Sequence, residues 1–206
     1  MLFVDGNNWY HSLREVGLTG VGQLNYARIS RKLCGPGRDW IGTRYYVGQV
    51  NQKHEPQLYA DQRSFLARLA ATDPKITHYL GRLEPRKIDN EAARELRQYL
   101  SSLKVRIDKT VFQDLMRLAR EHECVEVISE KAVDVMLAVD AVLLGERNEY
   151  DAAYLLTADG DFTPVATAVR SLGKRVYAAS PNQGAQLAAA VDTFIPLSSG
   201  WFADCW

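Results

Sequence analysis

Short apolar segments alternate with helical segments along this 206-residue chain, and the alternation restricts the fold more than any other feature. Strands are indicated where apolar, β-branched and aromatic residues cluster between turn residues, and helices where apolar residues recur at helical spacing. We expect strands at 2–5, 43–50, 75–80, 153–157, 175–179 and 193–196, and helices at 8–16, 25–33, 56–69, 132–144, 164–172 and 183–191. Such alternation predicts an α/β fold with a mainly parallel central sheet and helices on both faces.

The middle of the chain follows this pattern less clearly. Residues 90–103 and 112–122 have helical composition, and 105–107 is compatible with a short strand. The length favours a single domain, with an insertion around 84–130. The tail 198–206 carries Trp201, Phe202 and Trp206, and we expect it to pack on the core of its own chain or on a partner subunit.

Composition excludes several classes of protein. No apolar run approaches the ~20 residues that cross a bilayer. Three widely spaced cysteines form no metal-finger pattern, and their odd number argues against a disulfide scaffold. The four scattered histidines give no support for zinc. Together with the absence of a secretion signal, these features favour a cytoplasmic protein.

Charge is unevenly distributed although the net charge is zero. Residues 28–109 carry 17 basic and 9 acidic side chains, whereas residues 110–206 carry 7 basic and 14 acidic ones. A basic block beside an acidic one favours a surface that guides phosphates toward a metal pocket. Any single Arg or Lys is as readily explained by a solvated helix face.

Four aspartates form the candidate site. Asp5 follows the first expected strand, Asp159 and Asp161 follow the strand at 153–157, and Asp134 lies near the start of an apolar helix. The carboxyl ends of parallel strands meet at one edge of the sheet, where crowded carboxylates repel unless a cation or protons intervene. Taken singly, Asp5 and Asp161 are equally explained by a turn and a helix cap. The pattern as a whole predicts a divalent-metal site.

Two of these acids need separate comment. Asp134 has apolar neighbours on both sides, whereas a cap normally precedes the apolar run, so the sequence favours a functional role for it. Asp140 lies six positions further on, about 240° around the helix axis, and need not share its face. We therefore expect Asp140 either to support the site from behind or to pair with a basic side chain.

Several short blocks together resemble the NYN-domain family, in particular its LabA-like branch, which belongs to the PIN-like nucleases. The blocks are Phe3-Val4-Asp5-Gly6-Asn7-Asn8, Glu130-Lys131-Ala132-Val133-Asp134-Val135, Ala138-Val139-Asp140, Thr157-Ala158-Asp159-Gly160-Asp161-Phe162 and Gly173-Lys174-Arg175-Val176. The likeness covers roughly the first 50 and the last 80 residues. It departs at Ala132, where the family usually has a smaller residue such as glycine, and at 84–130, which looks longer than the minimal domain.

The resemblance implies a Rossmann-like, PIN-type fold and an acidic pocket that binds Mg²⁺ or Mn²⁺ and hydrolyses RNA, in some members other nucleic acids. On this chain it implies that Asp5, Asp134, Asp159 and Asp161 are the metal-binding and catalytic acids. Supporting polar roles would fall to Asn7, Asn8 and Thr157. Lys131, close to Asp134, is equally compatible with a phosphate contact and with a surface position.

Basic and aromatic residues suggest where nucleic acid binds. The first candidate set lies near Trp40, Tyr45 and Tyr46 and consists of Arg28, Arg31, Lys32, Arg38 and Arg44. The second set is Arg82, Arg86, Lys87, Arg94 and Arg97. Basic groups interleaved with aromatics suit single-stranded nucleic acid, although one of Tyr45 and Tyr46 should belong to the core because they alternate in a strand. The expected partner is single-stranded or structured RNA, and a homodimer is left open.

The leading interpretation is a metal-dependent nuclease, and the alternative is a nucleic-acid-binding or regulatory module that retains the acidic pocket with little turnover. Other folds with acidic strand ends fit less well. A haloacid-dehalogenase-type phosphatase needs a second Asp where Asn7 stands, and a Toprim-type site needs Glu where Asp5 stands. A dinucleotide-binding domain needs a glycine-rich fingerprint that Asp-Gly-Asn-Asn does not provide.

Overall fold

The chain divides into two compact units, which are described separately. The computed structural model describes residues 1–104, 106 and 108–206, and all of their side chains except those of 84–86 and 125–130. The first unit, here called the sandwich unit, comprises Met1–Arg82 and Glu130–Trp206. The second, here called the hairpin unit, comprises Leu83–Ser129. All catalytic and metal-binding candidates lie in the sandwich unit.

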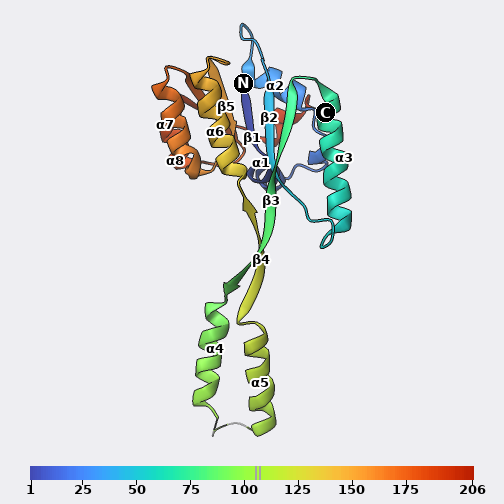
Figure 1. Ribbon diagram of the computed structural model, residues 1–206, viewed down its shortest axis with the longest axis vertical. Helices are drawn as coiled ribbons and strands as arrows, with labels where there is room; N and C mark the ends of the chain where they lie inside the picture. The colour runs from blue at the N-terminus through green and yellow to red at the C-terminus, as the bar shows by residue number, and fades with distance from the viewer. Residues whose placement is uncertain (105, 107) are drawn as a thin grey trace. The chain divides into compact units, whose positions relative to one another are not determined.

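The sheet has the strand order β4-β3-β2-β1-β5-β6-β7 (Figure 1). Its strands are β1 (Leu2–Asp5), β2 (Thr43–Gln49), β3 (Ile76–Asp89), β4 (Cys124–Lys131), β5 (Ala152–Leu156), β6 (Arg175–Ser180) and β7 (Thr193–Pro196). Every pairing described from β3 through β7 is parallel. The chain fills the sheet from β1 outward to β3 and then from β5 outward to β7. The direction of winding therefore reverses between β1 and β5, which confirms the predicted Rossmann-like α/β class.

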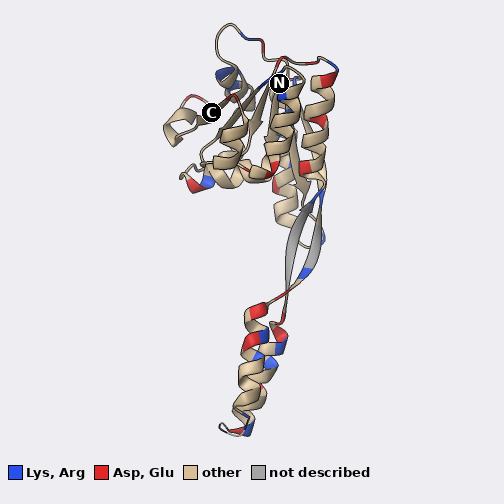
Figure 2. Cartoon of the chain, turned by 90° about the vertical axis from the view of Figure 1, so that its left-hand side faces the viewer, with Lys and Arg blue, Asp and Glu red and all other residues tan. Residues whose placement is uncertain are grey.

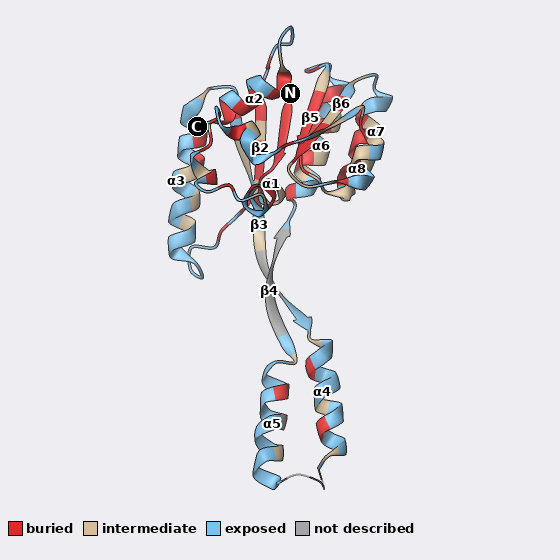
Figure 3. Cartoon of the chain, turned by 180° about the vertical axis from the view of Figure 1, so that it is seen from behind, coloured by how far each residue is buried: buried red, intermediate tan, exposed pale blue. Residues whose placement is uncertain are grey.

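Helices cover both faces of the sheet in the sandwich unit (Figures 1 and 3). One face is covered by α1 (Gly6–Glu15), α2 (Tyr26–Cys34) and α3 (Pro56–Thr72), and the other by α6 (Val133–Glu146), α7 (Thr163–Ser171) and α8 (Ala185–Ala190). Short 3₁₀ turns at Val21–Gln23, Gly160–Phe162 and Ser199–Phe202 complete the unit. No helix within the described residues is both long enough and apolar enough to span a membrane.

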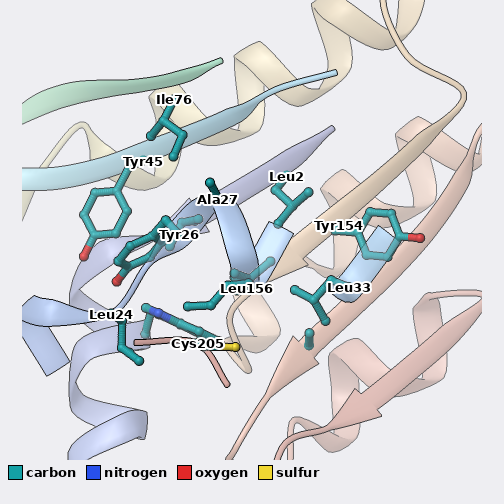
Figure 4. Packing of buried hydrophobic residues seen from close by; sticks show 14 of the residues in the cluster. Leu2, Leu24, Tyr26, Ala27, Leu33, Tyr45, Ile76, Tyr154, Leu156 and Cys205 are labelled. Atoms are coloured by element: carbon teal, nitrogen blue, oxygen red, sulfur yellow. The ribbon is translucent and has the colours of Figure 1, made fainter. Parts of the chain in front are cut away.

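Two apolar cores lie on opposite faces of the sheet, because side chains alternate along each strand. Leu2 and Val4 belong to one core, and Phe3 belongs to the other. Tyr45 and Tyr46 divide in the same way, and both are buried (Figure 4 shows Tyr45 in the first core). One of them was expected in the core and both lie there, since helices cover both faces and leave no solvent side at β2.

The aromatic tail packs on the first core. Phe202 and Cys205 are completely buried, and the Phe202 ring contacts that of Trp9 edge to face at 6.0 Å. Cys205 belongs to the same core as Leu156 and Leu33, all of which are labelled in Figure 4. The tail thus packs on its own chain, as one of the two sequence-based alternatives proposed.

Side-chain chemistry predicts Asn25 as the cap of the helix at 25–33, and Asn7 or Asn8 as the cap of the helix before it. Asn25 accepts a hydrogen bond from the Arg28 amide and caps α2, as predicted. The cap of α1, however, is Asp5, whose carboxylate accepts from the Asn8 amide at 3.3 Å. Asn7 and Asn8 lie inside the first turn, because the strand ends directly against the helix and Asp5 is the residue with extended backbone before it.

The hairpin unit contains two helices, α4 (Glu91–Ser102) and α5 (Lys109–Glu121), close to the expected ranges. β3 continues to Asp89, well past the expected end at 80, and β4 was not expected. Charged residues recur along 82–89 and mask the apolar alternation by which a strand is recognised. The strand expected at 105–107 includes positions 105 and 107, which lie outside the described residues.

Candidate active site

Asp5 and Thr157 meet at the carboxyl edge of the two central strands. β1 and β5 are parallel neighbours with Val4 opposite Leu156, so the next residue of each chain segment emerges at the same edge. The Thr157 hydroxyl donates to Oδ2 of Asp5 at 3.1 Å, and both residues are buried. This edge lies where the winding direction reverses, the position at which open α/β sheets bind their ligands.

The loop after β5 is held against β1 by a short series of hydrogen bonds. The Ala158 amide donates to Oδ1 of Asn8 at 3.2 Å, and the Asp159 amide donates to the Thr157 hydroxyl at 3.1 Å. Oδ1 of Asp159 then accepts from the Asp161 amide at 2.9 Å and caps the 3₁₀ turn Gly160–Phe162. The loop that carries Asp159 and Asp161 is therefore fixed through Asn8 and Thr157, while Asn7 is exposed.

Asp134 brings a fourth carboxylate from the other side of the site. It is the second residue of α6 and is exposed to solvent. Desolvation, followed by the negative charges of Asp159 and Asp161, raises the pKa of the Asp134 carboxyl above its usual range. The charges of the loop after β5 thus act on the carboxylate at the start of α6.

The start of α6 is conformationally strained. Ala132, the residue before the helix, has φ 70°, in the left-handed region that favours glycine. The resemblance noted above implies a small residue such as glycine at this position, and this backbone conformation gives a physical reason for it. Lys131 ends β4 immediately before it, with an exposed side chain. The left-handed residue lies two positions before Asp134.

Oxygen donors dominate this edge, and their chemistry fits Mg²⁺ or Mn²⁺. Both ions prefer carboxylate, hydroxyl and water oxygens, and Mg²⁺ is usually held by one or two carboxylates while it keeps several waters. Among the described residues, no three His, Cys, Asp or Glu side chains are spaced to hold one ion directly. The arrangement therefore fits an ion held partly through water rather than one enclosed by protein ligands.

Asp140 does not share the position of Asp134. Its Oδ2 accepts from Nη1 of Arg44 at 2.8 Å and from the Tyr46 hydroxyl at 2.7 Å. Arg44 also lies over the Tyr79 ring, 5.1 Å from its centre. Asp140 is thus the partner of a base, one of the two roles expected for it, and it ties α6 to β2.

The first set of basic candidates lies away from the acids. Arg44 is in register with Phe3, two residues before Asp5, and Arg38 donates to the hydroxyls of Tyr154 in the middle of β5 and Tyr177 in β6. The remaining three make contacts within the sandwich unit: Arg28 with main-chain oxygens of Asp204 and Trp206, Arg31 with Asp73, and Lys32 with Asp204 and the Trp201 carbonyl. The structure does not bring these five residues to the aspartates.

The second basic set is divided between the two units. Arg82 ends the first segment of the sandwich unit, whereas Lys87, Arg94 and Arg97 belong to the hairpin unit. Arg94 pairs with Glu91 and Arg97 pairs with Glu123. The side chain of Arg86 lies outside the described residues.

Close approaches at two glycines shape the site, and the sequence alone did not reveal them. A methyl group on Gly6 would lie 2.5 Å from the Tyr45 ring and 2.6 Å from the Tyr46 carbonyl oxygen. A methyl group on Gly160 would lie 2.2 Å from Oε1 of Gln186. Gln186, on α8, thus places an exposed amide beside the loop that carries Asp159 and Asp161. Its position depends on packing between distant segments, for which the local sequence carries no signal.

A doubly wound α/β sandwich with carboxylates at its winding reversal defines the general class of this protein. The chain belongs to the NYN domain family, whose sequence model matches residues 1–198. NYN domains are generally nucleases of the PIN-like superfamily. No curated protein matches the chain. A crystal structure of a Vibrio parahaemolyticus protein of unknown function is similar to it, with a TM-score of 0.52 and 15% identity over 96% of this chain and 91% of the other, which supports the fold.

Proposed function

We propose that this protein is a metal-dependent nuclease that hydrolyses phosphodiester bonds, with single-stranded or structured RNA as its substrate. The observation that carries the proposal is the shared carboxyl edge of β1 and β5, where the Thr157 hydroxyl binds Asp5 and accepts from the amide of Asp159. Membership of the NYN family supports the same conclusion. Carboxylates repel one another and the phosphates of a nucleic acid, so they would weaken a surface that only binds nucleic acid.

The roles of the residues follow from their positions. Asp5 and Asp159, held by Thr157, would bind Mg²⁺ or Mn²⁺, and Asp134 and Asp161 would complete the site through water or orient the attacking water. A bound divalent ion lowers the pKa of its water and neutralises charge on the scissile phosphate. Asn8 and Thr157 fix the loop geometry, and the exposed Lys131 would contact a phosphate of the substrate.

The test is cleavage of end-labelled RNA, in single-stranded and hairpin forms, with Mn²⁺, with Mg²⁺ and with EDTA. We expect cleavage with either ion, none in EDTA, and a loss of at least about 10²-fold in Asp159→Asn, because a charged metal ligand or water-orienting group is removed. Asp151→Asn is a matched control, because Asp151 directly precedes β5 at its amino end and is exposed.

Three outcomes separate the alternatives. Full activity in Asp159→Asn would contradict the assignment of the site. Equal loss in Asp151→Asn would show that the effect is not specific to the carboxyl edge. Mn²⁺ binding by calorimetry that is lost in Asp159→Asn, without cleavage of any RNA by the wild-type protein, would favour a binding module that retains the pocket.

A further inference from the structure

Each helix of the hairpin unit carries two apolar rows, of which the hairpin itself covers one. In α4 the buried row includes Ala93 and Leu100, and in α5 the row facing it includes Ala119, flanked by the half-buried Phe112 and Met116. The start of α4 meets the end of α5 through a hydrogen bond from the Asn90 amide to the Glu123 carbonyl at 2.8 Å. The two helices therefore run antiparallel and contact each other along these rows (Figures 1 and 3).

The second row is exposed on both helices. In α4 it contains Leu96 and Tyr99, which are 48% and 63% exposed. In α5 it contains Val111, Leu115 and Leu118, at helical spacings of four and three, which are 50%, 37% and 49% exposed. A helix that needs to bury only one side has one apolar stripe. A second stripe on both helices indicates a further layer that is packed against the hairpin.

Both exposed rows lie on one face of the hairpin. In each helix the exposed row precedes the buried row by one residue: Tyr99 precedes Leu100, and Leu118 precedes Ala119. One residue corresponds to a rotation of about 100° around the helix axis. Because the helices are antiparallel, equal rotations about their own directions turn the two rows toward the same side. The result is one continuous apolar face, here called the outer face, formed by Leu96, Tyr99, Val111, Leu115 and Leu118.

The charges of the hairpin unit identify the kind of partner. Residues 83–129 contain nine acidic and nine basic side chains, which cancel. Figure 2 shows the two signs interspersed along both helices. Several cations are paired locally, including Arg97 with Glu123 and Arg117 with Asp114 and Glu121. Such a surface lacks the net positive charge that nucleic acid binding requires. It also has no excess charge to repel an identical surface.

We propose that the outer face binds the outer face of a second copy of this chain, so that two hairpins form a four-helix bundle. A two-fold axis pairs each apolar row with an identical row of equal length and spacing. The charges around the outer face are balanced, so two copies of the face do not repel each other. The interaction rests on the hairpin unit and is independent of the proposed nuclease activity.

The test is the mass of the full-length protein in solution, measured by sedimentation equilibrium over a range of concentrations. The chain mass is 23.2 kDa, and we expect the wild-type protein to have twice this mass. Leu96→Glu combined with Leu118→Glu should give the mass of one chain, because four charges would be buried in each bundle. Gln98→Glu combined with Gln113→Glu adds the same charge to the same two helices, away from the outer face, and should remain dimeric.

Two results would overturn the proposal. One is a wild-type protein that stays a monomer at every concentration, as it would if its own sandwich unit or another molecule covered the outer face. The other is a Leu96→Glu, Leu118→Glu variant that remains dimeric. A milder pair, Leu96→Ala with Leu118→Ala, keeps helix propensity and guards against misfolding. It should raise the dimer dissociation constant at least tenfold, with unchanged helical circular dichroism, and an unchanged constant would also contradict the proposal.

Discussion

The sandwich unit buries the apolar side chains of its helices more completely than the hairpin unit does. In the sandwich unit, helices cover both faces of a sheet, so that even adjacent residues such as Tyr45 and Tyr46 are buried on opposite sides. In the hairpin unit, two helices cover only each other, and Leu96 and Leu118 stay about half exposed. The comparison shows that the number of apolar rows on a helix indicates how many neighbours it needs, within its own chain or outside it.

The largest expected effect tests whether the two units unfold independently of each other. Leu137 in α6 is completely buried, and Leu100 in α4 is almost so. Leu137→Ala should lower the free energy of unfolding of the sandwich unit by about 3 kcal/mol, from lost burial and a residual cavity. Leu100→Ala should leave that free energy within about 0.5 kcal/mol, because it removes nothing from the sandwich cores.

Tryptophan fluorescence provides the measurement. All four tryptophans, Trp9, Trp40, Trp201 and Trp206, lie in the sandwich unit, so denaturation followed by fluorescence reports that unit alone. Circular dichroism at the helical band reports both units. Leu100→Ala should shift only the circular dichroism transition. An equal shift of the fluorescence transition would show that the two units unfold together.

A second comparison concerns ion pairs. Arg44 and Asp140 in the sandwich unit are only 24% and 29% exposed, and the Tyr46 hydroxyl shares the same carboxylate oxygen. Asp140→Ala should therefore cost about 2 kcal/mol by the same fluorescence assay, since it leaves a cation and a hydroxyl without their acceptor. Glu121→Ala in the hairpin unit breaks a pair with Arg117 that is 66% and 53% exposed, and should cost less than about 0.5 kcal/mol by circular dichroism. Equal losses of stability in the two variants would mean that burial does not determine how strongly these ion pairs stabilise the fold.

The parts that sequence predicted best are those controlled by local pattern. The strands before Asp5 and Asp159, the apolar helix that carries Asp134 and the cap at Asn25 all follow from residue spacing and turn chemistry. Parallel strands then required the ends of β1 and β5 to share an edge. The metal-binding role of the acids remains a prediction that the cleavage experiment tests.

The parts that sequence did not predict depend on direction and on distant contacts. Arg44 lies near the start of a parallel strand and Asp5 at the end of its neighbour, so strand direction alone places them toward opposite edges. Proximity in sequence does not carry this information, because residues close in sequence can lie at opposite ends of a strand. The contact between Gly160 and Gln186 joins segments that only the folded sheet brings together.

A smaller effect tests the strain before α6. Ala132 adopts φ 70°, which costs an L-residue about 1–2 kcal/mol, whereas glycine occupies it without steric penalty but loses more backbone entropy on folding. Ala132→Gly should therefore stabilise the sandwich unit by about 0.5–1 kcal/mol in the fluorescence assay. Ala138→Gly, inside the regular part of α6, is the control for the exchange of alanine for glycine. It should destabilise the sandwich unit by about 1 kcal/mol. A loss of stability in Ala132→Gly would show that the backbone at Ala132 is not strained.

The smallest expected effect is a pH dependence that separates the carboxyl edge from the rest of the sandwich unit. The folded state raises the pKa of Asp134 above the ordinary value of 3.8, so the folded chain binds this proton more tightly than the unfolded chain. Stability therefore falls as pH rises from that ordinary value through the raised one, and a constant penalty remains at neutral pH.

In EDTA, Asp134→Asn should be more stable than wild type at pH 7, by less than about 0.5 kcal/mol because the carboxylate is exposed, and the difference should vanish near pH 3. Added Mn²⁺ should stabilise the wild type more than the variant, since an ion that binds only the folded state adds to its stability. If the variant is less stable than wild type at pH 7 in EDTA, the acids at this edge do not repel one another, and the case for a cation between them is lost.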